Sequence, residues 1–181
     1  MRLNEISLLD QVVLALLVEQ PRHGYGLVAA IGDDEALSMA IAVRRPLVYR
    51  AIADLERANL IVAGRKEVGE RGSSRTVFRA TSKGRRLSGQ WLDAVVEHPR
   101  DARLELLAKF ALRSRLGFSN RWLAAAQRRQ FERVATALRR SPPSQSSAAG
   151  LVRRWRYESV VAMIELLRDL ETGDETVSAG E

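Results

Sequence analysis

The chain has 181 residues, of which 46% are hydrophobic and 28% charged, a composition typical of a folded globular protein with one or two domains. Its 29 lysines and arginines against 22 aspartates and glutamates leave a net charge of +7, which favours a polyanionic partner without requiring one. With no cysteine and two histidines, the sequence excludes disulfides and thiolate zinc sites, and it predicts neither a metal centre nor a cofactor.

The sequence also gives an expectation for localisation. No apolar run reaches the roughly 18–20 residues needed to span a bilayer. Residues 1–20 lack the charged segment and cleavage site of a secretory signal. We therefore expect a cytoplasmic protein with no membrane partner.

Two helices are predicted before residue 33. Ser7 and Asp10 have the spacing of a capping box, and leucines and valines follow at helical intervals up to Pro21. A second, shorter helix is predicted from His23 to Ile31. Residues 33–43 remain open, because Met39 to Val43 fits either a short strand or a turn of helix.

The third predicted helix has a basic, aromatic first turn. Pro46 suits the first helical position, where a missing N–H group has no cost. The apolar face that should hold this helix to its domain consists of Leu47, Val48, Ala51, Ile52 and Leu55. Asn59 is the predicted end, since asparagine follows glycine in preference for the left-handed position after a helix.

After this helix, the spacing of hydrophobic residues changes from the helical period to the two-residue period of β-strands. Residues 61–66 and 75–80 are predicted strands, joined by the Gly/Ser/Arg loop from Val68 to Ser74. Thr81 is the predicted N-cap of a fourth helix that continues to about Val95. Residues 61–90 contain eight basic and two acidic side chains, a net charge of +6.

His98, Pro99 and Arg100 mark the clearest boundary, because a residue before proline does not readily continue a helix. Three helical segments are predicted beyond it, at 101–116, 119–139 and 151–171, with a Ser/Pro-rich loop before the last. We expect a DNA-binding domain at 1–97, a helical dimerisation or effector domain at 98–171, and a disordered or flexible tail at 172–181.

The order of elements in the first half is that of a winged helix-turn-helix. The N-terminal residues of a recognition helix reach base edges in the major groove, and a cationic hairpin follows the backbone of the duplex. The predicted contact residues on the third helix are Arg44, Arg45, Tyr49 and Arg50. Those on the wing are Lys66, Arg71, Ser73, Ser74 and Arg75.

Three segments resemble the PadR-like transcriptional regulators: "LALLVEQPRHGYGLVAAI", "VYRAIADLERANLI" and "VFRATSKGRRL". The resemblance covers about residues 9–95 and implies that Tyr49 touches DNA directly and that Tyr25 touches the backbone. Packing within the domain is the alternative role for each tyrosine. The chain departs from the family pattern at Ile52, Asn59 and Phe78, and in the stretch from Arg44 to Pro46, so we expect a site preference peculiar to this protein.

The second half resembles the helical C-terminal domain of the larger PadR subfamily, because "RLELLAKFAL" (Arg103–Leu112) is similar to the segment that usually opens that domain. The resemblance implies pairing of two copies through C-terminal helices and, in some members, binding of aromatic or planar effectors. The last helix carries two apolar stripes, which a second copy could help to cover. The candidate effector or dimer-interface residues are Trp91, Phe110, Trp122 and Trp155. For the tryptophans, packing is favoured over ligand stacking.

We expect a mainly α fold, in which a winged helix-turn-helix domain precedes an all-helical dimerisation domain. The expected function is that of a homodimeric, sequence-specific transcriptional regulator, with repression as the expected sign. Its expected partners are double-stranded DNA with an inverted-repeat operator and a small-molecule effector of unknown identity. The alternatives are a non-specific basic architectural protein and a protein-interaction module. An enzyme is least expected, because the sequence shows no catalytic set or nucleotide-binding loop.

Overall fold

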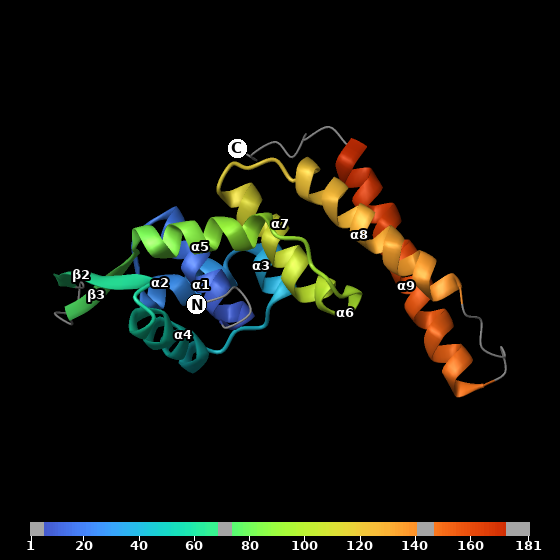
Figure 1. The fold of residues 1–181 in the computed structure, drawn as a ribbon. Coiled ribbons are helices and arrows are strands. Elements are labelled where there is room, and N and C mark those ends of the chain that lie inside the picture. The colour runs from blue at the N-terminus through green and yellow to red at the C-terminus, as the bar shows by residue number, and fades with distance from the viewer. Residues whose placement is uncertain (1–5, 69–73, 141–146, 173–181) are drawn as a thin grey trace. The chain divides into compact units, whose positions relative to one another are not determined.

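The computed structural model describes residues 6–68, 74–140 and 147–172 (Figure 1). The fold is mainly helical with one small antiparallel sheet, as the sequence predicts. The chain divides into an N-terminal unit, which comprises Met1–Ala94 and Ala102–Phe118, and a C-terminal unit, which comprises Val95–Asp101 and Ser119–Glu181.

Local capping signals start the first three helices. Helix α1 (Leu8–Glu19) begins at the predicted capping box, where the Ser7 hydroxyl accepts from the Asp10 amide and the Asp10 carboxylate accepts from the Ser7 amide. Helix α2 (Gly24–Gly32) begins after His23, whose Nδ1 accepts from the Gly26 amide at 2.9 Å. Helix α3 (Glu35–Ala40) begins after Asp34, whose carboxylate accepts from the Leu37 amide at 2.9 Å. Within the segment left open, Met39 and Ala40 are therefore helical, whereas residues 41–43 belong to neither a helix nor a strand.

Helix α4 (Arg45–Arg57) corresponds to the predicted third helix. Its buried face consists of Val48, Ala51, Ile52 and Leu55. The prediction for Leu47 is wrong: its side chain is 45% exposed, because a residue next to Val48 lies about 100° around the helix from it. Pro46 is the second helical residue rather than the first.

The predicted left-handed residue after α4 is confirmed. Asn59 has a φ of 56°, and the Leu60 amide donates to the Leu55 carbonyl at 2.9 Å, which closes the helix with a Schellman-type turn. The chain then enters the sheet directly.

The sheet has the strand order β1-β3-β2, with β1 at Arg22–His23, β2 at Ile61–Val68 and β3 at Ser74–Ala80. All pairs are antiparallel, and Ile61 pairs with Ala80 at the base of the hairpin. Figure 1 shows β2 and β3 extending beyond the helices of their unit. The two-residue β1 was not predicted, because so short a strand has no period.

Helix α5 (Ser82–Asp93) begins at the predicted cap, where the Thr81 hydroxyl accepts from the Gly84 amide at 3.0 Å. The helix packs very closely on the turn after α4. A Cβ atom added to Gly84 would lie 2.1 Å from the Leu60 carbonyl oxygen and 3.1 Å from Leu14 Cδ1. Glycine is therefore required at this position.

The predicted helix at 101–116 is a π-helical turn at Ala102–Leu106 followed by α7 (Leu107–Arg115), and both belong to the N-terminal unit. Lys109 is fully buried there, and its Nζ donates to the Ala94 carbonyl at 2.8 Å and pairs with Glu105 at 2.7 Å. Burial lowers the pKa of Lys109, against the opposing effect of Glu105. The predicted boundary between the two functional domains, after residue 97, stays a prediction.

The C-terminal unit contains the short α6 (Pro99–Asp101) and a pair of long helices, α8 (Arg121–Arg139) and α9 (Ala148–Thr172). Phe131 of α8 and Ile164 and Leu167 of α9 are buried in this unit. Arg128 pairs with Glu132 and Glu171, each at 2.7 Å, and its hydrogen bond lowers the pKa of Glu171. Most of the predicted Ser/Pro loop and tail, at 141–146 and 173–181, lies outside the described residues.

The packing of α5 generates a stability prediction. Gly84→Ala should lower the free energy of unfolding by about 1–3 kcal/mol, because the added methyl group meets backbone that cannot move aside. Gly89→Ala is the matched control on the same helix, since no atom lies within 4 Å of its Cβ position. It should be neutral or stabilising by up to about 1 kcal/mol. Urea unfolding measures both, and equal effects would contradict the proposed packing constraint.

Candidate nucleic-acid interface

The N-terminal end of α4 is an exposed cationic surface. Arg44, Arg45, Tyr49 and Arg50 are all exposed, while Val48 beneath them is fully buried. Within the described residues, no side chain caps this end of α4. Pro46 has no amide hydrogen, and the Leu47 amide donates to the Arg44 carbonyl at 2.9 Å, so the exposed arginine side chains, rather than a row of free amides, make this end attractive to an anionic group.

Two tyrosines and two arginines from three elements converge beside this helix end. The Arg45 guanidinium carbon lies 5.8 Å from the ring centroids of both Tyr25 and Tyr49. Arg75 of β3 lies 6.0 Å from the Tyr25 ring. Cations at this distance are attracted by the ring faces. We call these four residues the Tyr/Arg cluster.

The Tyr/Arg cluster borders a hollow of about 420 Å³. Its lining residues are His23, Gly24, Tyr25, Arg45, Tyr49, Arg75, Thr76 and Phe78. The hollow is therefore built jointly by the start of α2, the start of α4 and the wing strand β3. Sequence reasoning placed α2, α4 and the wing separately, and their convergence depends on the pairing of β1 with β3.

Gly24 is the residue of this site that sequence reasoning missed. A Cβ atom at Gly24 would lie 2.7 Å from Tyr49 Cε1, so the tyrosine ring rests directly on the backbone of α2. Tyr49 nevertheless remains 45% exposed and Tyr25 56% exposed. Tyr49 thus packs along one edge and faces solvent with the remainder, which leaves both of its expected roles compatible with the geometry. The "HGYG" motif marks the start of α2 in the sequence but does not indicate that Gly24 contacts Tyr49.

The structure describes only some of the predicted contact residues of the wing. Lys66 and Arg75 are exposed on β2 and β3. Ser74 is the first residue of β3 and pairs through its backbone with Val68. Arg71 and Ser73 lie outside the described residues.

Arg50 has an ionic partner on its own helix. Its Nε lies 3.7 Å from the Asp54 carboxylate, which Arg57 contacts more closely at 2.7 Å. The Arg50 side chain is 80% exposed, and exposed pairs of this kind contribute little stability. Arg50 can therefore exchange Asp54 for another acceptor at low cost.

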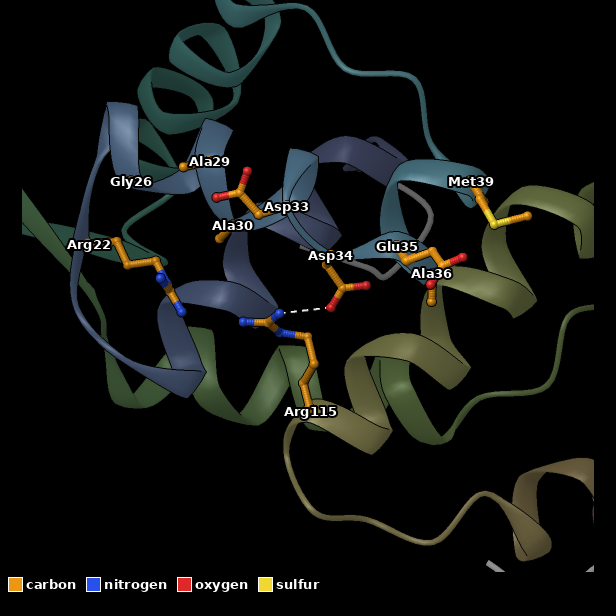
Figure 2. Close-up of a pocket in the computed structure, with 10 residues that line it drawn as sticks. All are labelled: Arg22, Gly26, Ala29, Ala30, Asp33, Asp34, Glu35, Ala36, Met39 and Arg115. Carbon is orange, nitrogen blue, oxygen red and sulfur yellow. Dashed lines mark hydrogen bonds and ion pairs between the residues drawn. The ribbon is translucent and has the colours of Figure 1, made fainter. Parts of the chain in front are cut away.

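A second, larger hollow of about 750 Å³ has a different electrostatic character (Figure 2). Asp33, Asp34 and Glu35 border it, and Arg115 reaches Asp34 at 2.8 Å. Burial alone would lower the pKa of Arg115, but its hydrogen bonds to Asp34 and Glu19 raise that pKa above its ordinary value. Arg22 also lines this hollow, so its border combines three acidic side chains with two arginines.

The four candidate effector or interface residues fall into two groups. Trp91 is buried in the N-terminal unit, where its indole donates to Glu105 at 3.1 Å, and Phe110 is half-buried. Trp122 and Trp155 are exposed, at 57% and 73%. A ligand or partner role for any of them stays a prediction.

The described residues contain no group of three or more His, Cys, Asp or Glu side chains that could hold a metal ion. None of the helices in the described part of the chain combines the length and the hydropathy that crossing a bilayer requires.

Residues 13–90 match the family model described as "Transcriptional regulator PadR-like family". Among solved structures, Bacillus subtilis PadR in complex with operator DNA aligns at 18% identity, with 91% of this chain and 98% of that chain covered and a TM-score of 0.48. The protein smu.1604c of Streptococcus mutans UA159 aligns at 13% identity, with coverages of 88% and 96% and a TM-score of 0.43. No curated protein matches the sequence.

The contact between Gly24 and Tyr49 generates a prediction for DNA binding. Gly24→Ala should displace the Tyr49 ring and weaken binding to a selected duplex about tenfold, since the loss of one contact to DNA typically costs about 1–3 kcal/mol. Gly32→Ala, at the other end of α2, is the control, because its Cβ position is open. In a Tyr49→Ala background, Gly24→Ala should have no further effect on affinity. An undiminished effect in that background would show that Gly24 acts through something else.

Proposed function

Because residues 13–90 match the model of the PadR-like family of transcriptional regulators, we propose that this chain is a homodimeric, sequence-specific DNA-binding repressor. The family is one of transcriptional regulators rather than enzymes. The observation that carries the specific proposal is the exposed, cationic N-terminal end of α4, which lies beside the Tyr/Arg cluster and the wing. We expect the regulator to act in the cytoplasm.

The proposal divides the contacts between two surfaces. The start of α4 enters the major groove, where Arg44, Arg45 and Arg50 donate to base edges. Tyr25 and Tyr49 line the approach to that groove. Lys66, Ser74 and Arg75 of the two wing strands, with Arg71 and Ser73 from the segment between them, contact the phosphate backbone beside it.

A dimer with two-fold symmetry places two copies of α4 on two half-sites. The operator is then an inverted repeat, with half-sites about one or two helical turns apart at roughly 34 Å per turn. The exposed Trp122 and Trp155 belong to the C-terminal unit, which we propose as the part that forms the dimer and receives any small-molecule effector.

One observation favours the alternative of a non-specific architectural protein. Residues 128–157 contain eight arginines and a single acidic residue, Glu132, so positive charge is not confined to the winged helix. Selection of bound fragments from a random duplex pool distinguishes the two functions. Enrichment of an inverted repeat supports the regulator, whereas equal affinity for unrelated duplexes at fixed salt supports the architectural protein.

The base-reading surface generates the first functional prediction. Arg44→Ala or Arg45→Ala should weaken binding to the selected operator by about 1–3 kcal/mol and leave binding to random duplex nearly unchanged. Fluorescence anisotropy with both duplexes at one salt concentration measures the two affinities. An equal decrease on both duplexes would place these arginines on phosphates instead.

The wing generates a contrasting prediction. Lys66→Ala or Arg75→Ala should weaken binding to operator and random duplexes alike, because an interaction with phosphate carries no sequence information. The slope of log K against log salt should decrease by about 0.9 for each phosphate that the variant no longer neutralises. A salt titration of both variants measures the slope, and an unchanged slope would remove the wing from the proposed interface.

A further inference from the structure

The hollow beside the Tyr/Arg cluster, which we call the Tyr/Arg hollow, has the size and the lining of a small-molecule site. Its volume of about 420 Å³ lies within the roughly 300–1,000 Å³ that is typical of such sites. Aromatic rings and two arginines line it, and no acidic side chain is among the described residues that do. The larger hollow of Figure 2, by contrast, is bordered by three acidic side chains together with its two arginines. The Tyr/Arg hollow is therefore the one that favours an anion.

The two arginines of this hollow are not occupied by carboxylates. In the part of the chain that the structure describes, neither Arg45 nor Arg75 forms an ion pair, although both are exposed. Each lies near an aromatic ring instead. A ring face attracts the cation without satisfying the five N–H donors of a guanidinium group. These donors therefore remain available to an anionic ligand.

The Tyr25 ring lies close to both cations. Its centroid is 5.8 Å from the guanidinium carbon of Arg45 and 6.0 Å from that of Arg75. The two arginines belong to different elements, α4 and β3, so both can reach one anionic group. More than half of Tyr25 is exposed, and an exposed aromatic ring can stack on a nucleobase of any kind. The hollow thus combines a stacking surface and a pair of cations within the extent of one small molecule.

The pair of guanidinium groups favours a phosphate over a carboxylate. A phosphate monoester carries a charge of about −1.5 to −2 at pH 7 and has three strong acceptor oxygens, whereas a carboxylate has a single charge and two oxygens. Guanidinium groups match the geometry of phosphate oxygens through paired N–H donors. A planar ring that carries a phosphate, as in a nucleoside monophosphate, therefore complements both parts of the hollow.

We propose that the Tyr/Arg hollow binds a nucleoside monophosphate, whose base stacks on Tyr25 and whose phosphate accepts from Arg45 and Arg75. This inference rests on the proposed function, because the same residues belong to the proposed DNA surface. The bound nucleotide and the operator therefore exclude one another, and the nucleotide releases the operator by direct competition. None of the four candidate effector residues, all of which the structure describes, lines this hollow.

The first test measures ligand chemistry without DNA. Isothermal titration calorimetry of the full chain should give a dissociation constant below about 1 mM for adenosine monophosphate. Adenosine lacks the anion, inorganic phosphate lacks the ring, and benzoate replaces the phosphate by a carboxylate. Each should bind at least about tenfold more weakly. A weaker dissociation constant for adenosine monophosphate, or equal binding of any of these three probes, would overturn the proposal.

The second test assigns the ligand to the hollow. Tyr25→Leu and Arg75→Ala should each weaken the binding of adenosine monophosphate at least about tenfold, whereas Tyr25→Phe keeps the ring and should retain the affinity. Arg79→Ala is the matched control on β3, because Arg79 is exposed but does not line the hollow. Circular dichroism verifies the fold of each variant. Unchanged affinity in Tyr25→Leu, or an equal loss in Arg79→Ala, would overturn the placement.

The third test measures competition with the duplex selected from the random pool. When adenosine monophosphate is present at ten times its own dissociation constant, the apparent dissociation constant of that duplex should rise about elevenfold and should keep rising in proportion. Fluorescence anisotropy measures the change, and a plateau would show simultaneous binding and overturn the competition. A chain that selects an operator but binds no nucleotide would overturn this inference alone. A chain that binds the nucleotide but selects no operator would overturn the proposed function alone.

Discussion

The carbonyl group of Leu60 is the point on which the fold of the N-terminal unit depends. It accepts from the Thr81 amide at 2.9 Å and from the Thr81 hydroxyl at 3.1 Å, and the backbone of Gly84 lies directly against it. The end of α4, the start of β2, the end of β3 and the start of α5 therefore meet at one peptide group. Because the left-handed Asn59 precedes it, α4 stops where the wing must begin.

Structural features that depend on only a few neighbouring residues could be predicted from the sequence. The capping box at Ser7, the left-handed Asn59 and the Thr81 cap each depend on one side chain and its immediate backbone, and all three are confirmed. The pairing of strands that are distant in the sequence could not be predicted. The two residues of β1 acquire their strand conformation from β3, which lies more than fifty residues away in the chain. The predicted burial of Leu47 was wrong because the helical period alone does not determine which residues at the margin of an apolar face are buried.

For the candidate site, the order of elements was more informative than the count of charges. Net charge alone would have pointed equally to residues 128–157, which lie on the α8–α9 pair and its connection. The succession of three helices and a hairpin instead singled out the start of α4, where the arginines and Tyr49 are exposed. The closeness of Gly24 to Tyr49 could not be predicted, because it depends on how α2 and α4 cross.

The position of Arg45 between two tyrosine rings has a consequence for the energetics of recognition. A long side chain that is free in solution loses rotamer entropy when it is immobilised, at about 0.5–1.5 kcal/mol. Attraction to the two rings at 5.8 Å restricts the exposed Arg45 side chain before any partner arrives, so in the proposed DNA complex less of this loss would fall on the association step. Selectivity at this position can then arise from rigidity, because an oriented guanidinium cannot readjust to a mismatched acceptor.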